Sequence, residues 1–181
     1  LLLNCGGTFY VLPHKSAGGY SGLKPVCTHN KRITDFCSWR GMLVLAGTRA
    51  DAAPDGHYFP AADGSAGLWF GDVDDLWKLG KPRGRGGPWL DTPVEAGLPS
   101  DAYLMTGFDE KTITLSHDHP SAVTIRIEVD FLRDGTWKTY TSIPVPAGQT
   151  VTHKFPAGYS AHWVRVVADR AARATAQLTY E

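Results

Sequence analysis

The sequence predicts an all-β protein, and three observations lead to this fold class. Apolar and polar residues alternate over several short segments, which is the period of half-buried strands. Gly, Pro, Asn and Asp separate these segments, as they do between the strands of a sandwich. The chain carries no 3.6-residue apolar repeat of ordinary helix length. We therefore expect two β regions, residues 1–108 and residues 109–181.

The first expected strand lies over residues 7–12 and ends at Pro13, with a loop over residues 16–24. Residues 33–39 and 42–47 are then expected to form a hairpin, because a tight turn containing glycine separates them. The second strand of this hairpin is almost wholly apolar. We therefore expect it to be a central strand, buried on both faces and with a neighbour on each side.

Residues 49–66 are expected to form a loop, and the segment after it, residues 67–89, is the most unusual part of the chain. It combines three tryptophans with carboxylates, basic side chains and glycines. A short strand is expected at residues 68–70, and one helical turn at residues 73–79 with Asp72 as its cap. Such a segment suits either recognition of a polyhydroxylated ligand or a long connection held in place by its own aromatic residues.

The C-terminal region shows the clearest strand pattern. Residues 123–131 alternate strictly, so Arg126 and Glu128 are expected on the exposed face. The residues expected to be buried are Val123, Ile125, Ile127, Val129 and Phe131. Further strands are expected at residues 112–116, 137–145, 151–155, 162–169 and 174–180. This series of short strands is typical of a small antiparallel sandwich.

The composition argues against two classes of partner. The 18 basic and 18 acidic residues balance, whereas a nucleic-acid-binding protein usually carries a basic face. No apolar stretch approaches the roughly 20 residues that span a bilayer. We therefore expect no nucleic acid, no membrane span and, because phosphate-binding glycine loops are missing from the sequence, no cofactor. The chain starts with Leu-Leu-Leu rather than Met, from which we expect a longer parent chain.

Cysteine and histidine spacing gives no metal site. The chain has three cysteines, Cys5, Cys27 and Cys37, and no CxxC pair. An odd number cannot close a disulfide framework, and without a CxxC pair no zinc site is expected. We expect three small buried side chains, with one disulfide and a spare thiol as the alternative. His117 and His119 would share one face of a strand, but no third ligand has a matching spacing.

Three carboxylates, Asp72, Asp74 and Asp75, lie close together in the sequence. Paired carboxylates carry out glycoside hydrolysis, one as acid and the other as base or nucleophile. The simpler interpretation is structural, with Asp72 capping the short turn and the other two solvated or paired with Lys78. Ligand contact, catalysis and binding of Ca²⁺, a hard ion that takes oxygen ligands, are kept as alternatives.

The remaining candidate residues are one histidine and a basic run. His29 precedes the expected hairpin and could act as an acid or base, although a hydrogen-bonded structural histidine is the simpler interpretation. Lys78 and Arg83 could hold an acidic sugar through pairing with its carboxylate, or belong to a solvated loop.

The tryptophans of residues 67–89 divide into two expected groups. Trp69 and Trp77 are expected to be mostly buried, because ordering a long connection costs roughly 1–2 kcal/mol of backbone entropy per residue and buried aromatic area offsets part of that cost. Trp89, Arg83 and Asp74 are then the side chains left for a ligand.

Some strings of residues resemble known proteins. The string ITDFCSWRGMLVLAG resembles the inner hairpin of a β-propeller blade. The strings GLWFGDVDDLWKLGKP, SDAYLMTGFDEKTITLSHD and SAHWVRVVAD are similar to the C-terminal region of large uncharacterised bacterial propeller proteins, which tend to occur with polysaccharide breakdown. The resemblance implies one or more partial propeller-like blades before the sandwich, and a secreted or periplasmic location.

Three functions follow from these expectations. The first is a carbohydrate-recognition or scaffold region of a secreted bacterial propeller protein, whose partner is a carbohydrate or the remainder of the parent chain. The second is a fragment of a glycoside hydrolase or polysaccharide lyase that uses His29, Asp72, Asp74, Asp75 and Arg83. The third is a structural assembly domain. A deep cleft between His29 and the aspartates would favour the enzyme.

Overall fold

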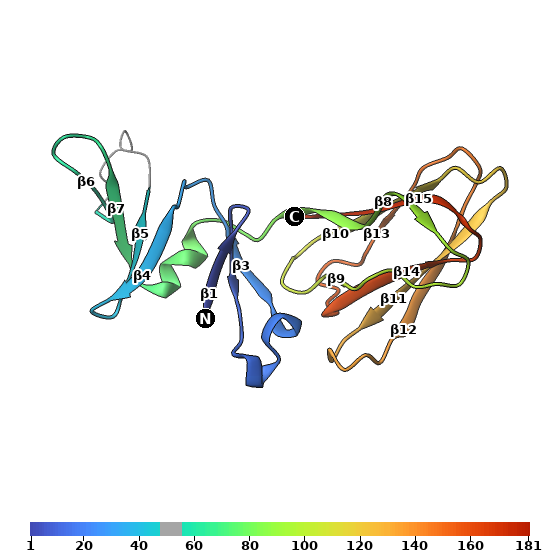
Figure 1. Cartoon of the computed structure of the whole chain (residues 1–181), viewed down its shortest axis with the longest axis horizontal. Coiled ribbons are helices and arrows are strands. Elements are labelled where there is room, and N and C mark those ends of the chain that lie inside the picture. The colour runs from blue at the N-terminus through green and yellow to red at the C-terminus, as the bar shows by residue number, and fades with distance from the viewer. Residues whose placement is uncertain (48–55) are drawn as a thin grey trace. The chain divides into compact units, whose positions relative to one another are not determined.

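The computed structural model describes residues 1–47 and 56–181, and its strands form four antiparallel sheets. The chain divides into two compact units (Figure 1). The N-terminal unit contains Leu1–Val11 and Val26–Lys81, and the sandwich unit contains Leu12–Pro25 and Pro82–Glu181. The all-β class is therefore confirmed, but the sandwich unit takes in residues 82–108 as well as the earlier segment Leu12–Pro25, and so does not start at residue 109.

The N-terminal unit carries two sheets and a short 3-10 helix. The three-stranded sheet has the order β1-β2-β3, and the four-stranded sheet has the order β4-β5-β7-β6. Their strands are β1 (Leu2–Cys5), β2 (Thr8–Val11), β3 (Lys24–Thr28), β4 (Asp35–Trp39), β5 (Met42–Ala46), β6 (Tyr58–Pro60) and β7 (Gly67–Gly71). The helix η3 covers Val73–Lys78, and the short helices η1 (Lys15–Ala17) and η2 (Gly19–Gly22) lie in the sandwich unit.

The expected hairpin is present, and β5 is its central strand with β4 and β7 on either side. Arg40 and Gly41 both have positive φ, the conformation of a two-residue turn between twisted strands. Val44 and Leu45 are both buried. Because β7 lies between β5 and β6, the sheet is not a meander of consecutive strands, and a propeller blade is not confirmed.

The core of the N-terminal unit lies between its sheets and η3. Its buried residues are Phe9, Cys27, Leu43, Leu45, Tyr58, Trp69 and Leu76. Burial of Trp69 confirms one expectation for residues 67–89, whereas Trp77 on η3 is 73% exposed, so the expectation that it is buried is wrong. Cys27 is the buried cysteine, while Cys5 and Cys37 are exposed free thiols. The expectation of three buried cysteines is therefore wrong for these two.

The sandwich unit packs two four-stranded sheets around one core. Their orders are β13-β10-β15-β8 and β12-β11-β14-β9. The strands are β8 (Gly84–Val94), β9 (Tyr103–Leu104), β10 (Lys111–His117), β11 (Val123–Asp130), β12 (Lys138–Val145), β13 (Val151–Lys154), β14 (Trp163–Ala168) and β15 (Ala172–Tyr180). Because β8 pairs with β15 and β9 pairs with β14, residues before 109 complete both sheets.

The alternation over β11 is confirmed for most positions. Val123, Ile125, Ile127 and Val129 are almost completely buried. Phe131 is 50% exposed, because β11 ends at Asp130 and the chain turns there. The expectation that Glu128 is exposed is also wrong. Its side chain lies on the outer face but is only 8% exposed, since two arginines cover its carboxylate.

Candidate functional site: a polar pocket on the outer face of the sandwich

His29 occupies a structural position in the N-terminal unit. Its Nε2 lies 3.1 Å from Oδ1 of Asn4, and its Nδ1 accepts a hydrogen bond of 3.2 Å from the backbone of Lys31. Its ring lies 5.1 Å from that of Phe9. Burial lowers the pKa of His29, because it disfavours the charged imidazolium.

The aspartate cluster forms the start of η3. The backbone N–H of Asp72 donates to Oδ2 of Asp75 at 2.8 Å, and Nζ of Lys78 donates to Oδ1 of Asp75 at 2.6 Å. The hydrogen bond from Lys78 lowers the pKa of Asp75. Asp74 is exposed. In the described part of the chain, no hydrogen bond joins His29 to these aspartates, so the two candidate groups do not form one site.

Arg83 and Trp89 belong to the sandwich unit, whereas Asp74 and Lys78 belong to the N-terminal unit. Arg83 is exposed. Trp89 is 5% exposed and lies in the sandwich core, opposite Ala176 of β15. The expectation that its ring is open to a ligand is therefore wrong, because the pairing of β8 with β15 turns it inward.

His117 and His119 also have separate roles. Nε2 of His117 lies 2.9 Å from the carbonyl oxygen of Val145, inside the sandwich, and Nδ1 of His119 accepts from the backbone of Ser121 at 3.1 Å. Within residues 1–47 and 56–181, no cluster of three or more His, Cys, Asp or Glu side chains is placed to hold a metal ion. The same residues include no helix that is long and apolar enough to cross a membrane.

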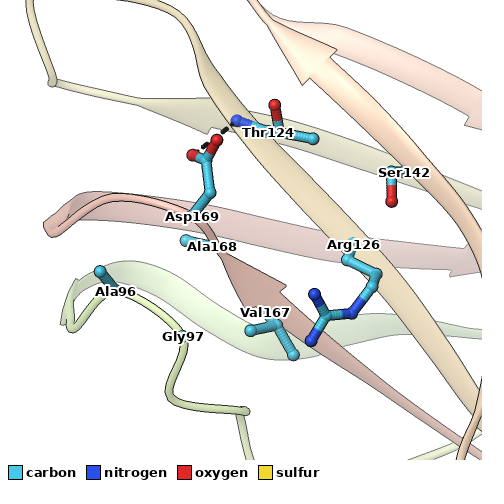
Figure 2. Close-up of a pocket in the computed structure, with 8 residues that line it drawn as sticks. All are labelled: Ala96, Gly97, Thr124, Arg126, Ser142, Val167, Ala168 and Asp169. Atoms are coloured by element: carbon cyan, nitrogen blue, oxygen red, sulfur yellow. Dashed lines mark hydrogen bonds between the residues drawn. The ribbon is translucent and has the colours of Figure 1, made fainter.

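A pocket of about 530 Å³ lies on the outer face of the β12-β11-β14-β9 sheet (Figure 2). Its lining residues are Ala96, Gly97, Thr124, Arg126, Ser142, Val167, Ala168 and Asp169. They come from three neighbouring strands, from the residue that follows β14 and from the segment that follows β8. All of them belong to the sandwich unit.

The register of the sheet explains why these side chains meet. Arg126 on β11 lies opposite Ser142 on β12 and opposite Val167 on β14, so the three form one row across the sheet. Directly opposite residues share a face and have Cβ atoms about 4.5–5.5 Å apart. The inward positions of β11 are filled by Ile125 and Ile127, which leaves the row of Arg126 on the outer face.

Asp169 closes one end of the pocket. Its Oδ1 accepts a hydrogen bond of 2.8 Å from the backbone of Thr124 (Figure 2). Its own backbone N–H donates to the carbonyl oxygen of Thr124 at 3.0 Å. The carboxylate thus continues the strand ladder beyond the end of β14. This pair of bonds fixes the position of an acceptor beside the hydroxyl group of Thr124.

Arg126 closes the other end and belongs to a charged array. Its Nε donates to Glu128 at 2.8 Å, and Nε of Arg165 donates to the other oxygen of Glu128 at 2.6 Å. The guanidinium of Arg165 lies 4.3 Å from the ring centroid of Trp137, within the range of a cation–π contact. Burial raises the pKa of Glu128, but the hydrogen bonds from the two arginines outweigh it and the pKa lies below its ordinary value.

The pocket was missed by reasoning from the sequence. The alternation of residues 123–131 places Thr124 and Arg126 on an outer face, and this is the one feature of the sequence that points to the pocket. Asp169 and Ser142 carry no motif. They join the site through the pairing of β11 with β14 and β12, and residues that far apart in the sequence give no local signal for their register.

Comparisons with known proteins assign no family. No protein-family model matches the sequence, and no curated protein matches it. Among solved structures, the chain is similar to the one titled "Crystal structure of PirA", with 17% sequence identity and a TM-score of 0.35. That similarity covers 49% of this chain and 89% of the other. A likeness this weak carries no argument about function.

Proposed function

We propose that the sandwich unit is a carbohydrate-recognition region, and that the pocket between Arg126 and Asp169 is its binding site. The observation that carries the proposal is the chemistry of the pocket lining. A guanidinium donor, a carboxylate acceptor and two hydroxyl groups surround a small aliphatic floor formed by the side chain of Val167. Sugars present hydroxyl groups that both donate and accept, and patches of C–H that pack on such a floor.

The pocket is built on a rigid support, which favours binding over an accidental depression. The strand ladder between β11 and β14 and the bonds between Asp169 and Thr124 hold its polar groups in place. Groups that are already ordered lose little entropy when a ligand binds. We further propose, following the resemblance to bacterial propeller proteins, that this recognition serves a secreted protein that acts with polysaccharide breakdown.

The test is a glycan array probed with the whole chain, followed by calorimetry on the glycans that bind. Asp169→Asn keeps the oxygen that accepts from Thr124 but removes the charge, and Ser142→Ala removes a hydroxyl group. We expect Asp169→Asn to weaken binding about tenfold or more, as loss of a hydrogen bond to a charged group does. Asp91→Asn is the matched control, because Asp91 lies on β8 of the other sheet and pairs with Arg173. Binding to no glycan, or equal binding by wild type and both pocket variants, would refute the proposal.

The N-terminal unit supports a second function, as a scaffold that packs on the remainder of a longer parent chain. On the outer face of its four-stranded sheet, the ring of Phe70 lies 6.4 Å from that of Trp39 and 5.7 Å from that of Phe59. Trp39, Phe59 and Leu68 are exposed, so this sheet is apolar on both faces. Exposed apolar patches of this kind mark interaction surfaces.

Iodide quenching of Trp39, taken as the difference between wild type and Trp39→Phe because Trp77 is also exposed, tests the scaffold function. We expect Trp39 to be shielded in a longer parent protein and accessible in this chain alone. Equal quenching in both would count against packing of this face. The hydrolase or lyase alternative receives no support from the contacts of His29 and Asp75, which are occupied by structural partners.

A further inference from the structure

The charged array at one end of the pocket carries a net positive charge, and the carboxylate of Asp169 lies at the other end. Arg126 and Arg165 both donate to the carboxylate of Glu128. Two guanidinium cations therefore share one anion, which leaves one net positive charge on the array. An exposed net charge that faces a pocket selects the charge of what binds there.

Arg126 is the arginine that presents this charge to the pocket. The Arg165 side chain is covered by Glu128 and by the ring of Trp137. The Arg126 side chain is 44% exposed and uses Nε for Glu128, and in the described part of the chain no other hydrogen bond is made by its guanidinium. Figure 2 shows the guanidinium group of Arg126 on the side of Val167, which also lines the pocket, so its Nη nitrogens are available there. Paired N–H groups of this kind match the two oxygens of a carboxylate.

In the described part of the chain, no ion pair joins the carboxylate of Asp169 to the guanidinium of Arg126, so the two charges stand at separate ends of the pocket. Asp169 is held beside Thr124, which lies two residues from Arg126 on the same strand. Two residues of a strand span about 7 Å. One pyranose ring with its substituents bridges such a distance, with an acidic group at one end and hydroxyl groups at the other.

We propose that the pocket selects sugars that carry a carboxylate, with the uronic acid group on the Nη nitrogens of Arg126 and ring hydroxyl groups on Asp169 and Ser142. This inference rests on the proposed carbohydrate recognition and names its ligand class. Glu128 is a positioning residue, because its carboxylate holds the Arg126 guanidinium at the pocket. It stays ionised at neutral pH, since its pKa lies below its ordinary value.

The test compares oligosaccharides of galacturonic acid and of glucuronic acid with the same oligosaccharides after reduction of their carboxyl groups. Affinities are measured by calorimetry on the whole chain. We expect the acidic forms to bind about tenfold or more tightly than the reduced forms, as charge-assisted hydrogen bonds allow. Added salt should narrow this difference, because the arginine is solvent-exposed.

Arg126→Gln should abolish the preference for the acidic form. It also removes one of the two donors to Glu128, so the thermal unfolding midpoint should fall, and near-UV circular dichroism checks that the variant is folded when its binding is measured. Arg173→Gln is the matched control, because Arg173 lies on β15 of the other sheet and should keep the preference. A protein that binds the reduced sugars as well as the acidic ones would overturn this inference while the proposed function stands. Binding of neither form, together with no binding to neutral glycans on the array, would overturn both.

Discussion

The Glu128 side chain contributes to both stability and the charge of the pocket. Its carboxylate accepts from two arginines and is nearly buried. A buried carboxylate is tolerated in a sheet when it is paired and hydrogen-bonded. The sequence places Glu128 on the polar face of β11, and the two arginines beside it convert an exposed position into a covered one.

We expect Glu128→Gln to destabilise the sandwich unit by about 1–3 kcal/mol at neutral pH, the range for hydrogen bonds to charged groups. The folded-state pKa of Glu128 lies below its ordinary value of 4.5, so its contribution is present above that value and is lost as pH falls through the folded-state pKa. The difference in unfolding free energy between wild type and Glu128→Gln should therefore shrink on acidification below about pH 4.5. Urea unfolding at several pH values measures it, and a constant difference down to pH 2 would contradict the assignment.

Two tryptophans of residues 67–89 should respond to truncation in opposite ways. Trp89 lies in the sandwich core, so Trp89→Ala should cost about 3–5 kcal/mol of unfolding free energy. Trp77 is exposed, so Trp77→Ala should change it by no more than about 0.5 kcal/mol. Chemical unfolding of the two variants makes the comparison. Similar losses in both would show that Trp77 packs against the protein in solution.

At the scale of elements, the turn between β11 and β12 depends on one buried carboxylate. Asp130 is the last residue of β11, and its oxygens accept from the backbone N–H groups of Leu132, Arg133 and Gly135 at 2.8–3.0 Å. This arrangement explains why the alternation of β11 does not continue to Phe131. The side chain that ends the strand also fixes the loop after it.

Asp130→Ala should therefore destabilise the sandwich by about 1–3 kcal/mol, because three backbone donors lose their acceptor. Asp134→Ala is the matched control in the same turn. Asp134 is exposed and accepts from the backbone of Thr136, so its loss should cost less than about 1 kcal/mol. Thermal unfolding followed by circular dichroism measures both variants, and an equal effect would contradict the role of Asp130.

At the scale of the whole molecule, the boundary of the sandwich is set by strand pairing and not by composition. β8 pairs with β15 along most of its length, and β9 pairs with β14. Trp89, Val94, Met105 and Phe108 from this part of the chain belong to the sandwich core. A boundary at residue 109 would remove all four and leave β14 and β15 with unpaired edges.

A polypeptide of residues 82–181 keeps every strand of the two sandwich sheets and lacks only the Leu12–Pro25 segment of the unit, so it should unfold cooperatively in urea, whereas residues 109–181 alone should not. The shorter polypeptide loses core area and exposes strand edges that promote aggregation. Near-UV circular dichroism and the steepness of the urea transition, which scales with the area exposed on unfolding, distinguish the two. Cooperative unfolding of residues 109–181 would show that β8 and β9 are dispensable.

The sequence by itself determined the features that depend on neighbouring residues. The pleat of a strand turns alternate side chains to opposite faces, so the burial of Val123, Ile125 and Ile127 follows from their spacing. The glycine turn between β4 and β5 and the short helix after Asp72 are local in the same sense. These elements are present as expected, because backbone geometry and side-chain polarity act over a few residues.

Only the tertiary structure decided which distant residues meet. Trp89 and Trp77 have the same side chain within one segment, yet one is buried by pairing with β15 and the other faces solvent. The site is decided in the same way, since Ser142, Arg126 and Asp169 come together through the registers of three strands. Register is fixed by burial of a shared core across the whole sheet, and that packing is encoded by no single stretch of the chain.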